Sequence, residues 1–195
     1  MASIKLTGDT SGEITISAPA VAGTNTITLP ASTGEILTTS NQSTNTPLCR
    51  VRQSSSTALS DNVIKKVEFD TVDFESGVTF DTTNHRFTVP SGANGYYMIN
   101  AMVSLDAQTN SDLSQASAYI YKNNSQEGKY NNFSANNNDN RRITLNLCQI
   151  VSLVATDYIE IFAKIDDNGL STACQVNVNF TELSIHKLIT WLENN

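Results

Sequence analysis

The stretch Tyr96-Tyr-Met-Ile-Asn-Ala-Met-Val-Ser-Leu105 decides the fold class of this chain. It is apolar at nearly every position, and one face of the extended chain carries Tyr97, Ile99, Ala101, Val103 and Leu105. A run of this kind predicts a central β-strand that is covered on both sides. The turn signal Asn94-Gly95 marks where the strand begins.

Further strands are predicted on both sides of this run. Upstream, Val67 and Phe69 alternate with polar residues, and Phe87 and Val89 share a face before Pro90. Downstream, alternating apolar positions predict strands over 116–120, 143–153, 159–165 and 174–185, the last with a change of phase that indicates a β-bulge. The only helix-like spacing is in the last turns, from Leu188 to Leu192. This pattern predicts an all-β chain with a C-terminal antiparallel jelly-roll sandwich over residues 47–188.

The first 46 residues differ from the rest, because they contain no aromatic residue and are rich in Thr, Ser, Gly and Ala. Short apolar pairs and glycines spaced by 11 residues (Gly12, Gly23 and Gly34) predict short strands too poor in apolar side chains to be stable alone. A flexible linker is the alternative. We expect residues 1–46 to form an N-terminal anchoring arm with a polar hinge, and residues 189–195 to form a tail. The expected docking side chains are Ile4, Leu6, Ile14, Ile16, Ile27 and Leu29.

Composition excludes several classes of function. The 195 residues carry a formal net charge of -7, which argues against nucleic acid as a partner. The sequence contains no run of 18 apolar residues, so we expect no membrane insertion, and the N-terminus lacks an apolar signal core. Both histidines are solitary, and no nucleophile elbow, Walker loop or dinucleotide fingerprint occurs. The sequence therefore predicts a non-enzymatic protein.

Three candidate sites follow from side-chain type. The segment 123–140 holds eight asparagines, which predicts either a solvated loop or a recognition loop using Tyr130, Asn132, Phe133 and Asn137. Asp166 and Asp167 could offer oxygens to calcium, but no cofactor is otherwise expected. Aromatic side chains in the strands are candidates for a trimer interface or for the core: Tyr97, Tyr119, Tyr121 and Phe162.

The stretch Val78–Tyr97 resembles the globular head of complement C-one-q and its tumour-necrosis-factor-like relatives. The matching positions of the Asp-x-x-x-x-x-Phe-x-x-Pro and Gly-x-Tyr patterns are Asp81, Phe87, Pro90, Gly95 and Tyr97. Downstream, Leu153-Val-Ala-Thr-Asp157 and Phe180-Thr-Glu-Leu183 resemble two more motifs of that family. The resemblance covers about residues 47–188 and implies a jelly roll that forms a homotrimer. Thr156 stands where the family has Gly and Ile99 where it has Phe, and no ligand site carries over.

Residues 13–34 are similar to a segment common in fibre and appendage proteins of tailed bacteriophages. This resemblance implies an arm that docks on capsid or tail proteins, and a location on the virion surface after synthesis in the host cytoplasm. We therefore expect a phage structural protein, as a capsid decoration or short head fibre whose trimeric knob projects outward. The knob, which carries no catalytic site, would adhere to a host-surface glycan or protein. The alternatives are a tail-fibre receptor-binding tip and a soluble cytokine- or lectin-like binding module.

Overall fold

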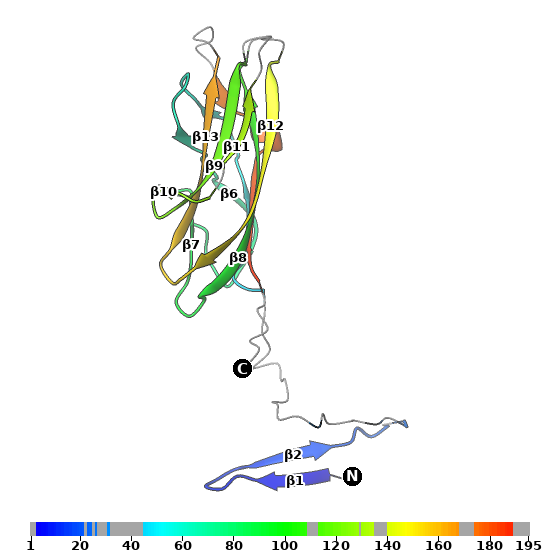
Figure 1. Cartoon of the computed structure of the whole chain (residues 1–195). Coiled ribbons are helices and arrows are strands. Elements are labelled where there is room, and N and C mark those ends of the chain that lie inside the picture. The colour runs from blue at the N-terminus through cyan, green and yellow to red at the C-terminus, as the bar shows by residue number, and fades with distance from the viewer. Residues whose placement is uncertain are drawn as a thin grey trace. The chain divides into compact units, whose positions relative to one another are not determined.

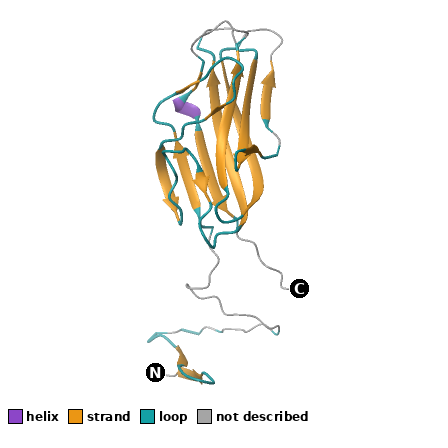
Figure 2. Ribbon diagram, turned by 90° about the vertical axis from the view of Figure 1, so that its left-hand side faces the viewer, coloured by secondary structure: helices purple, strands orange, loops and turns teal. Residues whose placement is uncertain are grey.

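The computed structural model describes residues 3–21, 23–24, 26, 31, 45–108, 113–128, 130–134, 140–167 and 174–188. Contacts divide the chain into two units, Met1–Gln42 and Ser43–Asn195. Apart from the short 3-10 helix η1 (Val178–Phe180), the regular structure of the described residues is β-strand (Figures 1 and 2), which confirms the all-β prediction. Ile27, Leu29, Asn137 and the predicted tail 189–195 lie outside the described residues.

The first unit contains an antiparallel hairpin of β1 (Ser3–Thr7) and β2 (Glu13–Ser17). Ile4 lies opposite Ile16 and Leu6 opposite Ile14, and directly opposed residues of an antiparallel pair share a face. These four predicted docking residues therefore form one apolar face, and they are 49–68% exposed. The other face is polar, with a 2.8 Å ion pair between Lys5 Nζ and Glu13 Oε1.

The second unit, here called the head, is built around β8 (Gly95–Asp106), which contains the deciding stretch. Along its whole length β8 pairs with β12 (Arg142–Leu153). Its other edge pairs with β15 (Glu182–Lys187) and β14 (Gln175–Val176), and the sheet continues with three short strands: β3 (Leu48–Arg52), β6 (Thr71–Ser76) and β4 (Thr57–Ala58). We call this layer the β8 sheet.

The second layer, the β9 sheet, has β9 (Gln115–Lys122) and β13 (Tyr158–Asp166) at its centre. The free edge of β9 pairs with β10 (Ser125–Gln126) and β11 (Asn131–Ser134). The free edge of β13 pairs with β5 (Lys65–Lys66) and β7 (Phe87–Thr88). Two antiparallel layers joined in this way form the expected jelly-roll sandwich.

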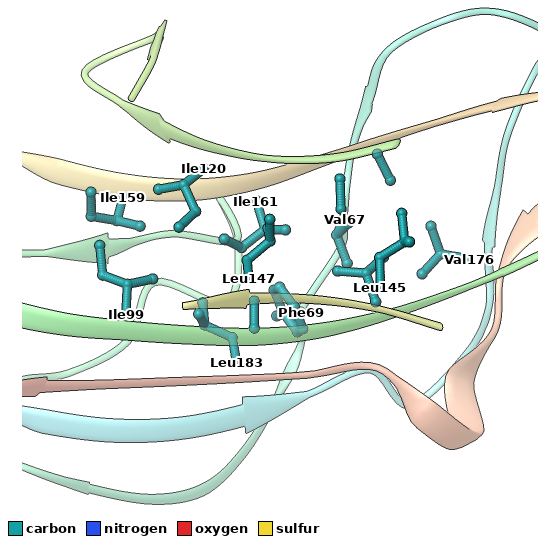
Figure 3. Close-up of a cluster of buried hydrophobic side chains, with 14 of the residues drawn as sticks. Val67, Phe69, Ile99, Ile120, Leu145, Leu147, Ile159, Ile161, Val176 and Leu183 are labelled. Atoms are coloured by element: carbon teal, nitrogen blue, oxygen red, sulfur yellow. The ribbon is translucent and has the colours of Figure 1, made fainter. Parts of the chain in front are cut away.

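The core fills the space between the two sheets, where Figure 3 shows side chains from strands of both layers pointing toward one another. The predicted alternation is confirmed, because the inward positions of the central strands are buried. Those labelled in Figure 3 include Ile99, Ile120, Leu145, Leu147, Ile159, Ile161 and Leu183. Tyr97 also belongs to the core rather than to an interface: it is fully buried, and its hydroxyl donates to the Ala93 carbonyl at 2.6 Å.

Two strand predictions need correction. β8 is central, but only its Asp106 half is covered on both faces: Ser104 and Asp106 on its outer face are buried, whereas Tyr96 and Asn100 on the same face are exposed in the single chain. The segment 174–185 is not one bulged strand, since η1 separates β14 from β15. This 3-10 turn causes the change of phase seen in the sequence, and it leaves Phe180 half exposed.

The chain enters and leaves the head at the Gly95 end of β8. There the Lys187 amide donates to the Pro47 carbonyl at 3.0 Å, and the Leu188 amide donates to the Tyr96 carbonyl at 2.8 Å. The last residues of β8 and β13 and the first residues of β12 lie at the opposite, Asp106 end. The first and last described residues of the head therefore lie at the Gly95 end, away from Asp106.

Replacing Thr156 with Gly should stabilise the head. Thr156 lies in the turn between β12 and β13 with a φ of 75°, a conformation that costs a residue with a Cβ about 1–2 kcal/mol and suits a β-branched residue poorly. Part of the gain is offset by the greater chain entropy of Gly in the unfolded state. We expect Thr156→Gly to raise the free energy of unfolding by about 1 kcal/mol in urea titrations, with Thr156→Asn in between. A lower stability of the Gly variant would contradict this.

Candidate functional site

A cluster of four aromatic rings lies on the outer face of the β9 sheet. We call Tyr119, Tyr121, Tyr130 and Phe162 the aromatic face. Tyr119 and Tyr121 alternate along β9, Phe162 lies opposite Tyr119 on β13, and Tyr130 comes from the segment before β11. The ring centroids are 5.0 Å apart for Tyr130–Tyr119, 6.4 Å for Tyr119–Tyr121 and 4.2 Å for Tyr121–Phe162. The rings are therefore contiguous across two strands and a connection.

Polar groups surround these rings. On one side the Ser117 hydroxyl donates to Asn132 Oδ1 at 2.8 Å. On the other side Lys66 Nζ lies 2.6 Å from Glu160 Oε1, and the Glu160 side chain is only 4% exposed. Further along the same face, the Arg86 guanidinium lies 4.7 Å from the centre of the Tyr158 ring. The arrangement combines flat apolar surface with fixed hydrogen-bonding groups.

A second candidate surface lies on the outer face of the β8 sheet. Here Ile150 is opposite Met98, Met98 is opposite His186, and His186 is opposite Leu48, so that one row crosses four strands. Tyr96, two residues before Met98 on β8, and Phe74, opposite Arg50 on β6, lie beside the row. We call Leu48, Phe74, Tyr96, Met98, Ile150 and His186 the apolar strip. Ile150, Tyr96 and Phe74 are each more than half exposed, at 60%, 53% and 52%.

Paired charges border the apolar strip. Arg50 lies within ion-pair distance of both Glu182 and Asp73, and Arg52 Nε lies 2.8 Å from Asp73 Oδ1. Beside them an open hollow of about 310 Å³ is lined by strip residues Leu48, Phe74 and His186, among others. An apolar centre with a polar rim is the usual anatomy of a protein–protein interface.

Only some of the residues predicted for the recognition loop lie on one surface. Tyr130 is exposed and stacks on Tyr119, and Asn132 points outward to Ser117. Phe133 instead packs against the core as a partly buried side chain, because it alternates with the outward Asn132 along β11. Two sets of residues that the sequence presented separately, Tyr130 with Asn132 and Tyr119 with Tyr121 and Phe162, thus share one face.

The structure does not gather the aspartates proposed for calcium into a metal site. The Asp166 carboxylate accepts from the Ser114 hydroxyl at 2.9 Å. The Asp167 side chain is fully buried, and Cys174 Sγ lies 3.2 Å from its Oδ2. Within the described ranges no group of three or more His, Cys, Asp or Glu side chains is placed to hold a metal ion.

A cluster of charged side chains, Asp106 with Arg141 and Arg142, lies at the Asp106 end of the head. The fully buried Asp106 carboxylate accepts from Arg142 Nη2 at 2.6 Å, from Arg141 Nε at 3.1 Å and from the Gln108 amide at 2.8 Å. Burial alone would raise the pKa of Asp106, but the bonds from Arg142, Gln108 and Arg141 outweigh it, and its pKa is lowered from the ordinary value.

Sequence reasoning missed the apolar strip, because the deciding stretch was interpreted as buried on both faces. One signal was present. The outward positions of β12 are occupied by Arg142, Thr144, Asn146, Cys148 and Ser152, and Ile150 is the one aliphatic side chain among them. Cys148, on the same outward face of β12, is an exposed thiol, whereas Cys49 and Cys174 are buried.

The comparisons with known proteins bear on the fold. No protein-family model and no curated protein matches the sequence. Among solved structures, the chain is similar to the globular domain of zebrafish complement 1qA protein, with a TM-score of 0.55 at 11% sequence identity, over 74% of this chain and 98% of that one. At that identity the likeness shows the fold alone: the head has a complement-head-like jelly roll, as the motif resemblance implied. Among the described residues, no helix has the length and apolar character needed to cross a membrane.

Proposed function

We propose that this chain is a non-enzymatic structural protein of a phage virion, whose arm docks on the particle and whose head is a trimeric binding module. The observation that carries the proposal is the apolar strip. Monomeric proteins rarely leave so many neighbouring large apolar side chains exposed, and identical heads arranged around a symmetry axis would cover them. Three is the copy number implied by the resemblance to complement heads.

The hairpin supports the docking role of the arm. Its four aliphatic side chains all point to one face, and the residues facing the other way are Ser, Thr, Lys and Glu. A two-stranded hairpin is at best marginally stable by itself, so the apolar face needs a surface to pack against. The similarity of residues 13–34 to segments of phage fibre and appendage proteins favours a capsid or tail protein as that surface.

Reversing the polarity of the hairpin should detach the protein from the particle. In the full chain, Ile14→Asp together with Ile16→Asp places two charges on the apolar face. Because burying each isoleucine contributes about 1.5–3 kcal/mol, binding to phage particles that lack the protein should weaken at least about tenfold in co-sedimentation.

The matched control is Thr15→Asp with Ser17→Asp, which adds the same charges to the polar face of the same strand. The control should bind like the wild type, and light scattering should give the same trimeric mass for all three proteins. Undiminished binding of the apolar-face variant would move the attachment site from the arm to the head.

A further inference from the structure

We propose that the aromatic face binds uncharged carbohydrate. The inference rests on the proposed function of the head as a binding module, and it names the class of ligand. It starts from the rings. Tyr130 is 49% exposed, and Tyr121 and Phe162 are partly exposed, whereas Tyr119 is 7% exposed and lies between its neighbours.

Tyr119 supports the exposed rings. It contacts Tyr130 at an interplanar angle of 30° and Tyr121 edge to face, and Tyr121 meets Phe162 at 35°. The ring positions are therefore set by mutual packing before any ligand arrives, which reduces the ordering cost of binding. A pyranose ring has faces of C–H bonds that pack against aromatic rings, and a row of adjacent rings suits consecutive units of an oligosaccharide.

The rim provides partners for sugar hydroxyl groups. The accessible groups are the exposed Asn132 at one side and the partly exposed Lys66 at the other, and the buried Ser117 and Glu160 side chains hold them in place through a hydrogen bond and an ion pair. Tyrosine hydroxyls and an amide side chain can both donate and accept, and the lysine ammonium group donates. Flat apolar area beside such groups matches the alternating C–H and O–H surface of a sugar.

Charge favours an uncharged ligand. The outward residues of β13 around Phe162 are Glu160, Lys164 and Asp166, and Lys66 lies beside them on β5. These two cations and two anions balance, and the closest pair, Lys66 with Glu160, is joined at 2.6 Å. Arg86, further along the face, is paired with Asp81 at 3.5 Å. Among the described residues the face therefore shows no excess of positive charge that would attract sialylated or sulfated glycans, while the chain as a whole carries -7.

The test uses the full-length protein in titration calorimetry. The probes are maltohexaose, cellohexaose, laminarihexaose, mannohexaose and N-acetylchitohexaose, with heparin and colominic acid as anionic comparators. We expect at least one neutral probe to bind with a dissociation constant below about 1 mM, and the anionic probes to bind more weakly.

Variants locate the site. Tyr130→Ala and Phe162→Ala should each weaken binding of that neutral probe at least about tenfold, because each removes a stacking surface. Phe162→Tyr should restore it. The matched control, Phe180→Ala, removes a half-exposed ring from η1, outside both the aromatic face and the apolar strip, and should leave carbohydrate affinity unchanged.

Absence of binding by every neutral probe, or preference for an anionic one, would overturn the inference. Dissociation of the assembly by Tyr130→Ala or Phe162→Ala would also overturn it, because the aromatic face would then be a contact between copies of this chain. Light scattering of the unmodified protein separates the two proposals: a monomer that binds a neutral probe contradicts the trimeric head and leaves the carbohydrate site standing.

Discussion

We expect Ile150→Arg to convert the proposed trimer to a monomer. In light scattering, the mass should fall from about three times the 21.2 kDa of one chain to that of a single chain. Ile150 is 60% exposed in the single chain, at the end of the strip row. The substitution replaces aliphatic area that assembly would bury with a charge, and the row has no acidic residue to pair with it. The loss is repeated in every copy, so the effect on assembly is large.

The thiol of Cys148 reports on the same face independently of mass. Cys148 lies two residues from Ile150 on β12 and is exposed, whereas Cys49 and Cys174 are buried. In the trimer, its reaction with dithiobis(nitrobenzoate) should be at least about tenfold slower than in Ile150→Arg, because assembly covers it.

The control variant is Val63→Arg, at an exposed aliphatic residue outside the strip. It should remain trimeric with a protected thiol. Equal and rapid modification of Cys148 in all proteins would show that the β8 sheet is not the contact surface.

Asp106→Asn should cost the head about 3 kcal/mol in free energy of unfolding, because the variant breaks a buried ion pair while leaving a polar amide in its place. Asn keeps one accepting oxygen but puts an NH2 donor in place of the other, so it cannot accept from both Arg141 and Arg142 as the carboxylate does, and their charges lose the opposite charge. Chemical denaturation at neutral pH measures the loss. Glu68→Gln, which removes one member of the exposed ion pair with Lys65, should change stability by less than about 1 kcal/mol.

The effect of Asp106→Asn should depend on pH. The folded-state pKa of Asp106 is lowered, so its ionised form contributes stability above the unfolded-state pKa of about 3.9. That contribution is lost as the pH falls from there through the folded-state pKa. The stability difference between wild type and variant should therefore be constant near neutral pH and shrink below about pH 4. A difference that grows in acid would contradict the proposed role of the carboxylate.

Most of the sandwich could be predicted from the sequence, because period-two alternation reports directly on which face of a strand is buried. Ile159, Ile161 and Ile165 on β13 are all fully buried, as that pattern requires. The prediction of one bulged strand over 174–185 was wrong for a physical reason. A single 3-10 turn shifts the alternation of buried and exposed residues much as a bulge does, so the pattern alone cannot distinguish the two. The positive φ of Thr156 was likewise hidden, although the glycine expected there by resemblance pointed to it.

The candidate surfaces were harder to predict, because each is assembled from strands far apart in the chain. Tyr119 and Tyr130 come into contact only because the β10–β11 segment folds back on β9. Phe133 was assigned to the same loop surface, but one position along a strand reverses the face, and it joined the core. Cross-strand rows such as Ile150, Met98 and His186 depend on register, which no local pattern specifies.

The position of residues 45–47 and 188 at one end of the head has a practical meaning for protein engineering. The ends of β8 and β13 and the start of β12 lie at the other, Asp106 end of the head. Foreign peptides inserted in the chain between these strand ends would change that end of the head without altering the strands that carry the strip or the rings. The head thus separates the end at which it can be attached from the end at which inserted sequences can be varied, as a display scaffold requires.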